Sequence, residues 1–256
     1  MRLPWKTGRR IGTVTCVVLV AERQNECVKQ QKTRRKEKTK VTQRMLNCVS
    51  NYERGSLWKR WVKTEEHRNA LPRDIYRHLV AFDITELDVE IRKDIHRTFP
   101  QHTVFRDAKY AQDALFNVLK AYALYNPDVG YCQGMSFIAG MLVLYMNEED
   151  AFFTMVGVME KNDAKRLFLP QMPLLVRYCS VLDDYVRRKM RKLYRHLRTQ
   201  DIDTAIIATQ WFLTMFTYSF TLDAAALLWD VILARDGNFV VPIAIVILKL
   251  LEVGAD

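Results

Sequence analysis

Residues 130–146 read GYCQGMSFIAGMLVLYM, and this stretch decides the fold. From position 136 to position 146 it is apolar nearly all round, which is typical of a helix buried on every side. The residues before it place Gly130 and Gly134 around a glutamine, and glycines allow tight backbone there. The stretch therefore predicts a loop that opens a central buried helix.

The chain on both sides of this stretch also has a helical pattern. Residues 108–125 carry one apolar stripe at helical spacing, made by Ala114, Leu115, Val118, Leu119 and Tyr122. Further helices are expected over residues 88–98, 148–161, 174–199, 204–218, 223–235 and 241–253, with turn signals such as Phe99-Pro100 and Asn126-Pro127 between them. No segment alternates with period 2 for long, so we predict an all-α, multi-helix fold with no significant sheet.

Composition divides the chain into two parts. With 49% hydrophobic and 27% charged residues, the 256-residue chain is typical of a soluble globular protein. Nine of its ten net positive charges lie in residues 1–43, which we expect to be a disordered, solvated tail. The tail could instead touch anionic lipid or RNA, or act as a nuclear signal. Residues 44–256 are nearly neutral and are expected to form the folded domain, without a dedicated nucleic-acid site.

Residues 11–21 form an apolar stretch behind Arg9-Arg10, which fits either a secretory signal or an ordinary apolar patch. No run reaches the ~18–20 apolar residues of a membrane span. The five cysteines are scattered and contain no C-x-x-C pair. Reduced thiols in a cytosolic protein are therefore expected.

The motifs of several enzyme classes are missing. The sequence has no G-x-x-x-x-G-K-[ST], G-x-G-x-x-G, H-E-x-x-H or G-x-S-x-G, and its histidines do not pair at ligand spacing. We therefore expect no metal site and no cofactor of its own. The absence of these motifs argues against a hydrolase that acts without a partner.

One motif places Ile91, Asp94 and Arg97 at i, i+3 and i+6 of a helix. Asp94 can hydrogen-bond Arg97 at this spacing, although such pairs are commonly only solvated ion pairs. Arg97 lies at the predicted helix end, where a side chain can project beyond the protein while its neighbour fixes its stem.

A second motif, Tyr131-Cys-Gln133, lies in the glycine loop. An amide side chain on such a rim can hold a water or a carbonyl group. The local sequence equally fits a glutamine that caps the helix or bonds to the core.

Together, these motifs resemble the I-x-x-D-x-x-R and Y-x-Q pair of the TBC domain, the Rab GTPase-activating module. The resemblance covers about residues 48–256 and extends to Gln210-Trp-Phe-Leu-Thr214 and Leu228-Trp229-Asp230. It implies that Arg97 is an arginine finger and that Gln133 stands in for the glutamine of the GTPase. Asp94 would orient Arg97, while Ile91 and Tyr131 would pack and position the two loops.

The resemblance also implies a role and a partner. The chain would act in vesicle trafficking as a GTPase activator rather than as an enzyme in its own right. Its partner would be a GTP-bound Rab-type GTPase, to which GTP and Mg²⁺ belong. The chain would be cytoplasmic or peripheral to endomembranes, with weak anionic membrane contact through residues 1–43. The alternative is a catalytically weak TBC-like binding module or scaffold for a GTPase.

Two departures from the family pattern stand out. The opening segment keeps Arg54, Gly55 and Trp58 of G-I-P-x-x-L-R-G-x-x-W, with Arg54 and Trp58 as supporting site residues, but lacks its Gly and Pro. We therefore expect an altered turn before the first helix. The chain ends at Asp256, so the family's final helices are expected to be shortened or missing.

Overall fold

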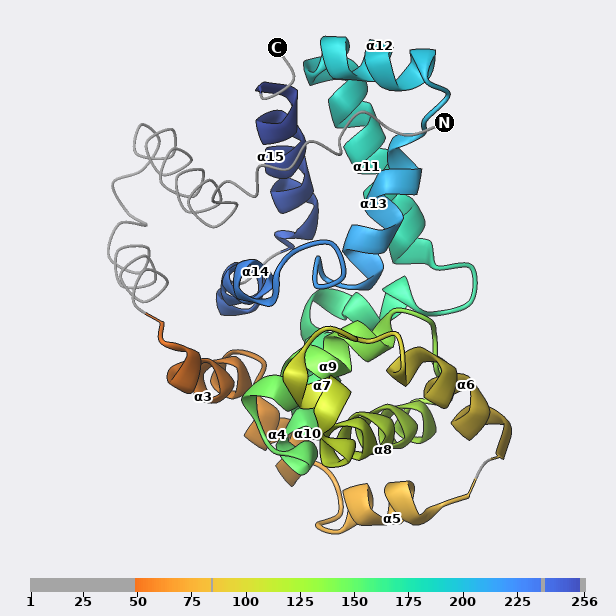
Figure 1. Ribbon diagram of the computed structural model, residues 1–256, viewed down its shortest axis with the longest axis vertical. Coiled ribbons are helices and arrows are strands. Elements are labelled where there is room, and N and C mark those ends of the chain that lie inside the picture. The colour runs from red at the N-terminus through yellow and green to blue at the C-terminus, as the bar shows by residue number, and fades with distance from the viewer. Residues whose placement is uncertain (1–48, 84, 236–237, 254–256) are drawn as a thin grey trace.

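The computed structural model describes residues 49–83, 85–235 and 238–253 (Figure 1). Within these ranges every regular element is a helix and no strand occurs, which confirms the all-α prediction. The basic tail and the apolar stretch at residues 11–21 lie outside the described residues.

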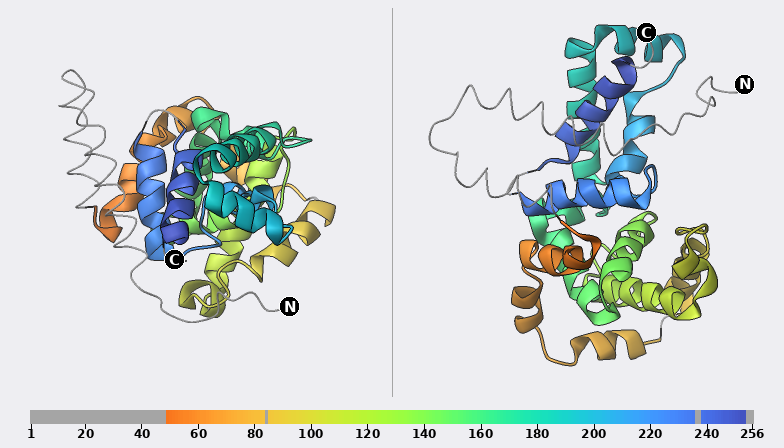
Figure 2. Two further views of the ribbon diagram at one scale, coloured as in Figure 1. Left: turned by 90° about the horizontal axis from the view of Figure 1, so that it is seen from above. Right: turned by 60° about the vertical axis from the view of Figure 1, so that its left-hand side comes forward.

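The helices form two lobes, one above the other in Figure 1, and the second view in Figure 2 shows the same division. The lower lobe holds α3 (Asn51–Trp61), α4 (Thr64–Asn69), α5 (Ile75–Ala81), α6 (Thr85–Ile95), α7 (Thr103–Asp107), α8 (Lys109–Tyr125), α9 (Met135–Tyr145) and α10 (Glu148–Glu160). The chain then continues through η1 (Lys161–Leu167), α11 (Pro173–Lys189), α12 (Arg191–Thr199), α13 (Thr204–Leu213), α14 (Leu222–Ala234) and α15 (Val240–Val253). Helix α14 lies between the lobes and packs against α3.

Helix α9 is the centre of the lower lobe, as its apolar sequence predicted. Its first eight residues, 135–142, are all buried, and it contacts α3, α6, α8 and α10. All five residues of the predicted stripe on α8 are buried as well. Burying one such large apolar side chain stabilises the fold by about 1.5–3 kcal/mol, so these two helices hold the lobe together.

The first helix begins without the family's Gly and Pro. Ser50 precedes α3, and both its backbone N–H (3.2 Å) and its hydroxyl (2.8 Å) donate to the carboxylate of Glu53. A Ser followed three residues later by Glu is a common signal for a helix start. The pair of Ser50 and Glu53 thus begins α3 without those two residues.

Three predicted helices break or end early. The helix expected over 88–98 ends at Ile95, so Arg97 lies in the turn that follows it and not in the last helical turn. The helix expected over 174–199 breaks at Met190, whose side chain is buried, and continues as α12. A continuous helix would place Arg187 and Arg188 four residues from Arg191 and Lys192, and like charges at that spacing repel. The helix expected over 204–218 ends at Leu213, because the following residues form a buried turn.

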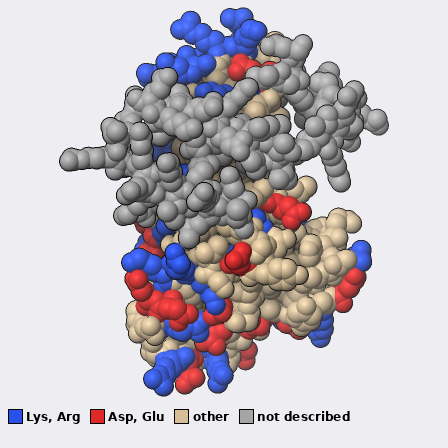
Figure 3. All heavy atoms as spheres, turned by 90° about the vertical axis from the view of Figure 1, so that its left-hand side faces the viewer, with Lys and Arg blue, Asp and Glu red and all other residues tan. Residues whose placement is uncertain are grey.

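The end of the second lobe is strongly basic. Seven exposed cations follow one another around the α11–α12 break: Arg187, Arg188, Lys189, Arg191, Lys192, Arg195 and Arg198. Blue side chains accordingly gather at the top of the face in Figure 3, where Figure 1 places α12. No helix among the described residues is both long enough and apolar enough to cross a bilayer.

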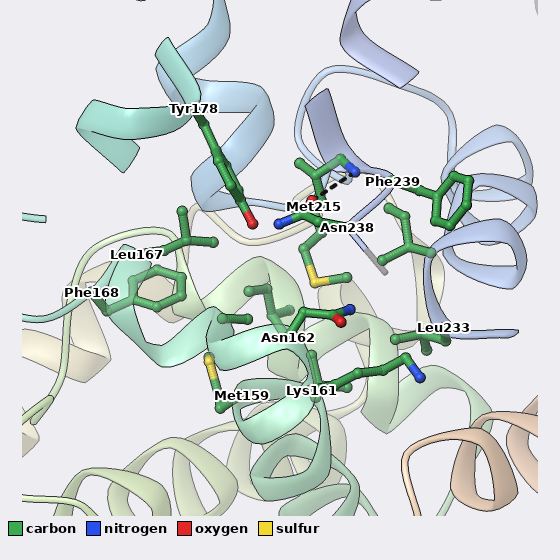
Figure 4. A pocket seen from close by; sticks show the side chains of 15 residues that line it. Met159, Lys161, Asn162, Leu167, Phe168, Tyr178, Met215, Leu233, Asn238 and Phe239 are labelled. Atoms are coloured by element: carbon green, nitrogen blue, oxygen red, sulfur yellow. Dashed lines mark hydrogen bonds between the residues drawn. The ribbon is translucent and has the colours of Figure 1, made fainter. Parts of the chain in front are cut away.

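A small cavity lies where η1, α11 and the start of α15 meet (Figure 4). Its volume is about 30 Å³, and its lining is mostly apolar, with Leu167, Phe168 and Met215 among the side chains. A space of this size holds one or two waters. It is too small for a nucleotide or an organic cofactor.

Candidate functional site

Arg97 stands in a tight turn just beyond the end of α6. The backbone N–H groups of Arg97 and Thr98 donate to Asp94 (3.2 Å) and Ile95 (3.0 Å), and the Thr98 hydroxyl donates to the Asp94 carbonyl at 2.8 Å. Phe99 then adopts a left-handed backbone, with φ of 49°, ahead of Pro100. The turn leaves the side chain of Arg97 52% exposed, so its guanidinium faces solvent.

The carboxylate of Asp94 joins the two sequence motifs. One of its oxygens accepts a hydrogen bond from the Arg97 guanidinium, and the other accepts one from the Tyr131 hydroxyl at 2.6 Å. The Asp94 side chain is only 7% exposed, so the acceptor of both bonds is buried, while the Arg97 side chain remains about half exposed. Charge-assisted bonds of this kind are stronger than neutral ones, and Asp94 therefore fixes the stem of Arg97 against the glycine loop.

Burial and the charge of Asp94 also change the pKa values of two neighbouring side chains. Burial, together with the hydrogen bond to Asp94 and its charge, raises the pKa of Tyr131 well above its ordinary value. Tyr131 therefore stays protonated at physiological pH and remains a donor. Burial, and to a lesser degree the charge of Asp94, raises the pKa of the Cys132 thiol, so this thiol stays protonated too.

Gln133 lies two residues beyond Tyr131 and is exposed. Within the described part of the chain its side chain makes no hydrogen bond, so it is neither a helix cap nor bonded to the core. The helix cap is Gly134 instead, whose φ of 104° favours glycine. Arg97 and Gln133 thus both carry solvent-exposed tips on loops that Asp94 connects.

Gly140, inside α9, allows the turn that carries Arg97 to pack closely against this helix. A Cβ at Gly140 would lie 2.8 Å from Phe99 Cε2 and 3.2 Å from Thr98 Cγ2. Phe99 also packs edge-on against Phe137 of α9, with ring centroids 5.5 Å apart. We did not predict Gly140 or Phe99 as site residues, although a glycine within an apolar helix is a signal of close approach.

The remaining predicted site residues occupy the interior. Ile91 is fully buried on α6. Arg54 and Trp58 do not join the Asp94 cluster: both donate to the buried carboxylate of Asp230 on α14, at 3.0 Å and 2.8 Å. Their contacts therefore support the packing of α3 against α14.

The described residues do not bring three or more His, Cys, Asp or Glu side chains together in a way that could hold a metal ion. The two loops that Asp94 connects expose the guanidinium of Arg97 and the carboxamide of Gln133. A guanidinium binds phosphate oxygens through its planar fork of donors. A carboxamide can accept and donate at once, so it can hold a water molecule in place.

Comparison with known proteins identifies the family of this chain. The sequence model of the Rab-GTPase-TBC domain matches residues 51–253. The Rab GTPase-activating protein eat-17 of Caenorhabditis elegans is 40% identical over 159 residues, which are 62% of this chain and 18% of that protein. The human Ecotropic viral integration site 5 protein homolog is 30% identical over 219 residues, which are 85% of this chain and 26% of that protein.

A solved structure shows the same fold. The Chlamydomonas flagellar RabGAP TBC domain superposes with a TM-score of 0.74 at 24% identity, over 94% of this chain and 82% of that one. The chain thus spans most of a solved TBC domain but only about a fifth to a quarter of the two curated relatives. Because the family pattern extends over almost all the described residues, this chain belongs to the Rab-GTPase-TBC domain family.

Proposed function

We propose that the chain activates GTP hydrolysis by a GTP-bound Rab-type GTPase, with Arg97 as an arginine finger and Gln133 as a second group supplied in trans. The observation that carries this proposal is the Asp94 carboxylate, which binds Arg97 and Tyr131 at once and so joins the loops of both exposed side chains. The name of eat-17 as a Rab GTPase-activating protein supports the same role.

The proposed mechanism divides the work between two proteins. The partner GTPase holds GTP and Mg²⁺, so the chain needs no cofactor of its own. Negative charge on the oxygens of the transferring phosphoryl group is stabilised by Arg97, an effect that is worth roughly 10³–10⁵ in rate for arginine fingers. Gln133 orients the attacking water, as the glutamine of a GTPase does.

Asp94 supports the finger in two ways. Its bond to Arg97 reduces the number of rotamers open to a long side chain before the GTPase arrives, which lowers the entropy lost on docking. Its negative charge also compensates the guanidinium in the free protein. Tyr131, which stays protonated, holds Asp94 from the opposite side, and the buried Ile91 anchors the helix that carries both.

Single-turnover hydrolysis across a panel of GTP-loaded Rab proteins tests the proposal. We expect acceleration by the wild-type chain, a loss of about 10³-fold or more with Arg97→Ala, and a large loss with Gln133→Ala. Binding to a Rab loaded with a non-hydrolysable GTP analogue is expected to persist in both variants. Full stimulation by the Arg97→Ala protein would overturn the finger assignment.

Arg187 offers a matched control. It forms the same i, i+3 pair with Asp184, and its side chain is 53% exposed, but it lies on α11 in the other lobe. Arg187→Ala is therefore expected to leave stimulation unchanged. Binding of a Rab without any acceleration by the wild-type chain would favour the scaffold alternative instead.

A further inference from the structure

The last residue of α13 lies against the loop that carries Gln133, and the turn between α13 and α14, residues 214–221, follows it. A Cβ at Gly134 would lie 3.3 Å from the carbonyl oxygen of Leu213, the last residue of α13. The backbone of this turn therefore starts in contact with the residue that follows Gln133.

An aromatic chain connects the same turn to Arg97. The ring of Tyr218 packs edge-on against Phe137, with centroids 5.1 Å apart and an interplanar angle of 83°. Phe137 in turn packs edge-on against Phe99, which lies two residues beyond Arg97. Tyr218 thus contacts Phe137 of α9 directly and is connected to the Arg97 turn through it.

The backbone of the turn is strained. Met215 and Phe216 both adopt left-handed conformations, with φ of 46° and 67°, which are unfavourable for residues with a side chain. The buried indole of Trp229 holds the turn by donating to the Met215 carbonyl at 3.2 Å and the Thr217 hydroxyl at 3.1 Å. Such strain persists only where the surrounding structure enforces it, and it is common at functional sites.

The strained turn divides its side chains between the interior and the surface. Met215 points into the small cavity of Figure 4, and residues 214–217 are all buried. Tyr218 follows them directly, yet it is 58% exposed. Single exposed apolar residues are ordinary on protein surfaces. Tyr218, however, follows a strained turn and packs on Phe137, the same ring that contacts Phe99 of the Arg97 turn.

We propose that Tyr218 is a binding residue for the partner GTPase, and this inference rests on the proposed function. Its ring would pack against an apolar part of the GTPase surface that flanks the nucleotide. Tyrosine suits this role because it offers a large contact area with few rotatable bonds, and it is enriched where binding energy concentrates. Phe137 packs against the ring, and this contact favours some Tyr218 rotamers over others before docking.

This role predicts a kinetic signature. A contact made equally in the bound ground state and in the transition state changes KM and leaves kcat unchanged. Arg97 and Gln133 are expected to act chiefly on kcat, since their bonds strengthen as charge develops. When the GTPase concentration is varied, a Tyr218 variant should therefore change KM, whereas Arg97 and Gln133 variants should change kcat.

The test measures stimulated hydrolysis over a range of GTPase concentrations with the full chain. Tyr218→Ala is expected to raise KM about tenfold or more, with kcat within twofold of wild type. Tyr218→Phe keeps the ring and is expected to stay close to wild type. Tyr52→Ala removes a tyrosine that is 98% exposed on α3, on the side of the lower lobe away from α6 in Figures 1 and 2, and should change neither constant.

Several outcomes would overturn the inference. An unchanged KM for Tyr218→Ala would do so, and so would a loss of kcat at constant KM, which would make Tyr218 a positioning residue acting through Phe137. Thermal melting monitors folding, and Tyr218→Gln supplies a second variant that keeps a long side chain over Phe137. If the wild-type chain neither binds nor stimulates any GTPase of the panel, the proposed function fails together with this inference. If the wild type is active and both variants match it, only this inference fails.

Discussion

The hydroxyl of Tyr131 donates to the carboxylate of Asp94 at 2.6 Å, across 37 positions of sequence. This bond joins the two sequence motifs into one site, because the same carboxylate also accepts a hydrogen bond from Arg97. The proposed catalytic roles depend on Asp94 as the shared acceptor. The role of Asp94 can be tested without changing Arg97 or Gln133, the two side chains that would touch the GTPase.

Asp94→Asn should weaken GTPase stimulation while the protein stays folded. The amide still accepts a hydrogen bond but no longer offers Arg97 a charged partner. Hydrogen bonds to charged groups contribute about 1.5–3 kcal/mol, so we expect kcat to fall about 10- to 100-fold, less than with Arg97→Ala. Asp184→Asn removes an exposed carboxylate that pairs with Arg187 in the other lobe, and it should have no effect. Equal losses from both variants would contradict a specific role for Asp94.

Alkylation of Cys132 should report the charge of Asp94. Burial and the Asp94 carboxylate raise the pKa of this thiol, so less thiolate is present at any given pH than for a free cysteine. The rate of reaction with iodoacetamide is therefore expected to be slow at pH 7.5 and to rise steadily toward pH 9. Asp94→Asn removes the negative charge, lowers the pKa and should speed the reaction severalfold, as followed by mass spectrometry of the Cys132 peptide.

Cys179 is the internal control for that measurement. Burial also raises its pKa, but the nearby negative charge is that of Asp203. Its alkylation should not respond to Asp94→Asn. A parallel change at both cysteines would point to a general opening of the structure and would contradict the local electrostatic explanation.

Gly140→Ala should lower GTPase stimulation even in the fraction of the protein that remains folded. The new Cβ would lie 2.8 Å from Phe99 Cε2, and the Phe99 ring is held by Phe105 and Phe137, so the Arg97 turn must shift. We expect a loss of about 1–3 kcal/mol of unfolding free energy, together with a lower kcat in the folded protein. Stability is measured by urea unfolding and kcat by single-turnover hydrolysis at saturating chain.

Gly55→Ala is the matched comparison. Its Cβ would lie 2.3 Å from the Tyr145 carbonyl oxygen, so backbone must move and the loss of stability should be at least as large. The clash is between α3 and the end of α9, however, and not at the Arg97 turn. The fraction that remains folded is expected to stimulate hydrolysis normally. If Gly55→Ala lowered kcat as much as Gly140→Ala, the Phe99 contact would have no special role.

Asp230→Ala should destabilise the fold strongly. It would leave the guanidinium of Arg54, whose side chain is only 6% exposed, without its buried partner, and it would remove the acceptor of the Trp58 indole. Breaking a buried ion pair on one side costs about 3–5 kcal/mol, which urea unfolding can measure directly. Asp230→Asn keeps an acceptor for Trp58 and should cost less. A change below about 1 kcal/mol with Asp230→Ala would show that α3 is not held to α14 by this carboxylate.

The sequence by itself determined the helical class and the identity of the candidate side chains. The stripe on α8 and the apolar run of α9 set their buried faces, because helix periodicity is a local property of the chain. The order and spacing of the Ile91, Asp94 and Arg97 motif and of Tyr131 and Gln133 likewise carry the family resemblance within the sequence itself.

Tertiary structure alone decided which distant residues share a partner. The pairing of Tyr131 with Asp94, and of Arg54 and Trp58 with Asp230, depends on how helices pack, and no local pattern encodes it. Neither the break at Met190 nor the strained turn at Met215 has a glycine or proline to mark it. The basic residues on both sides of Met190 disfavour a continuous helix, but they do not fix the conformation that replaces it. Burial of Met190 and the hydrogen bonds of Trp229 fix these conformations instead, and both depend on residues that only the folded chain brings within reach.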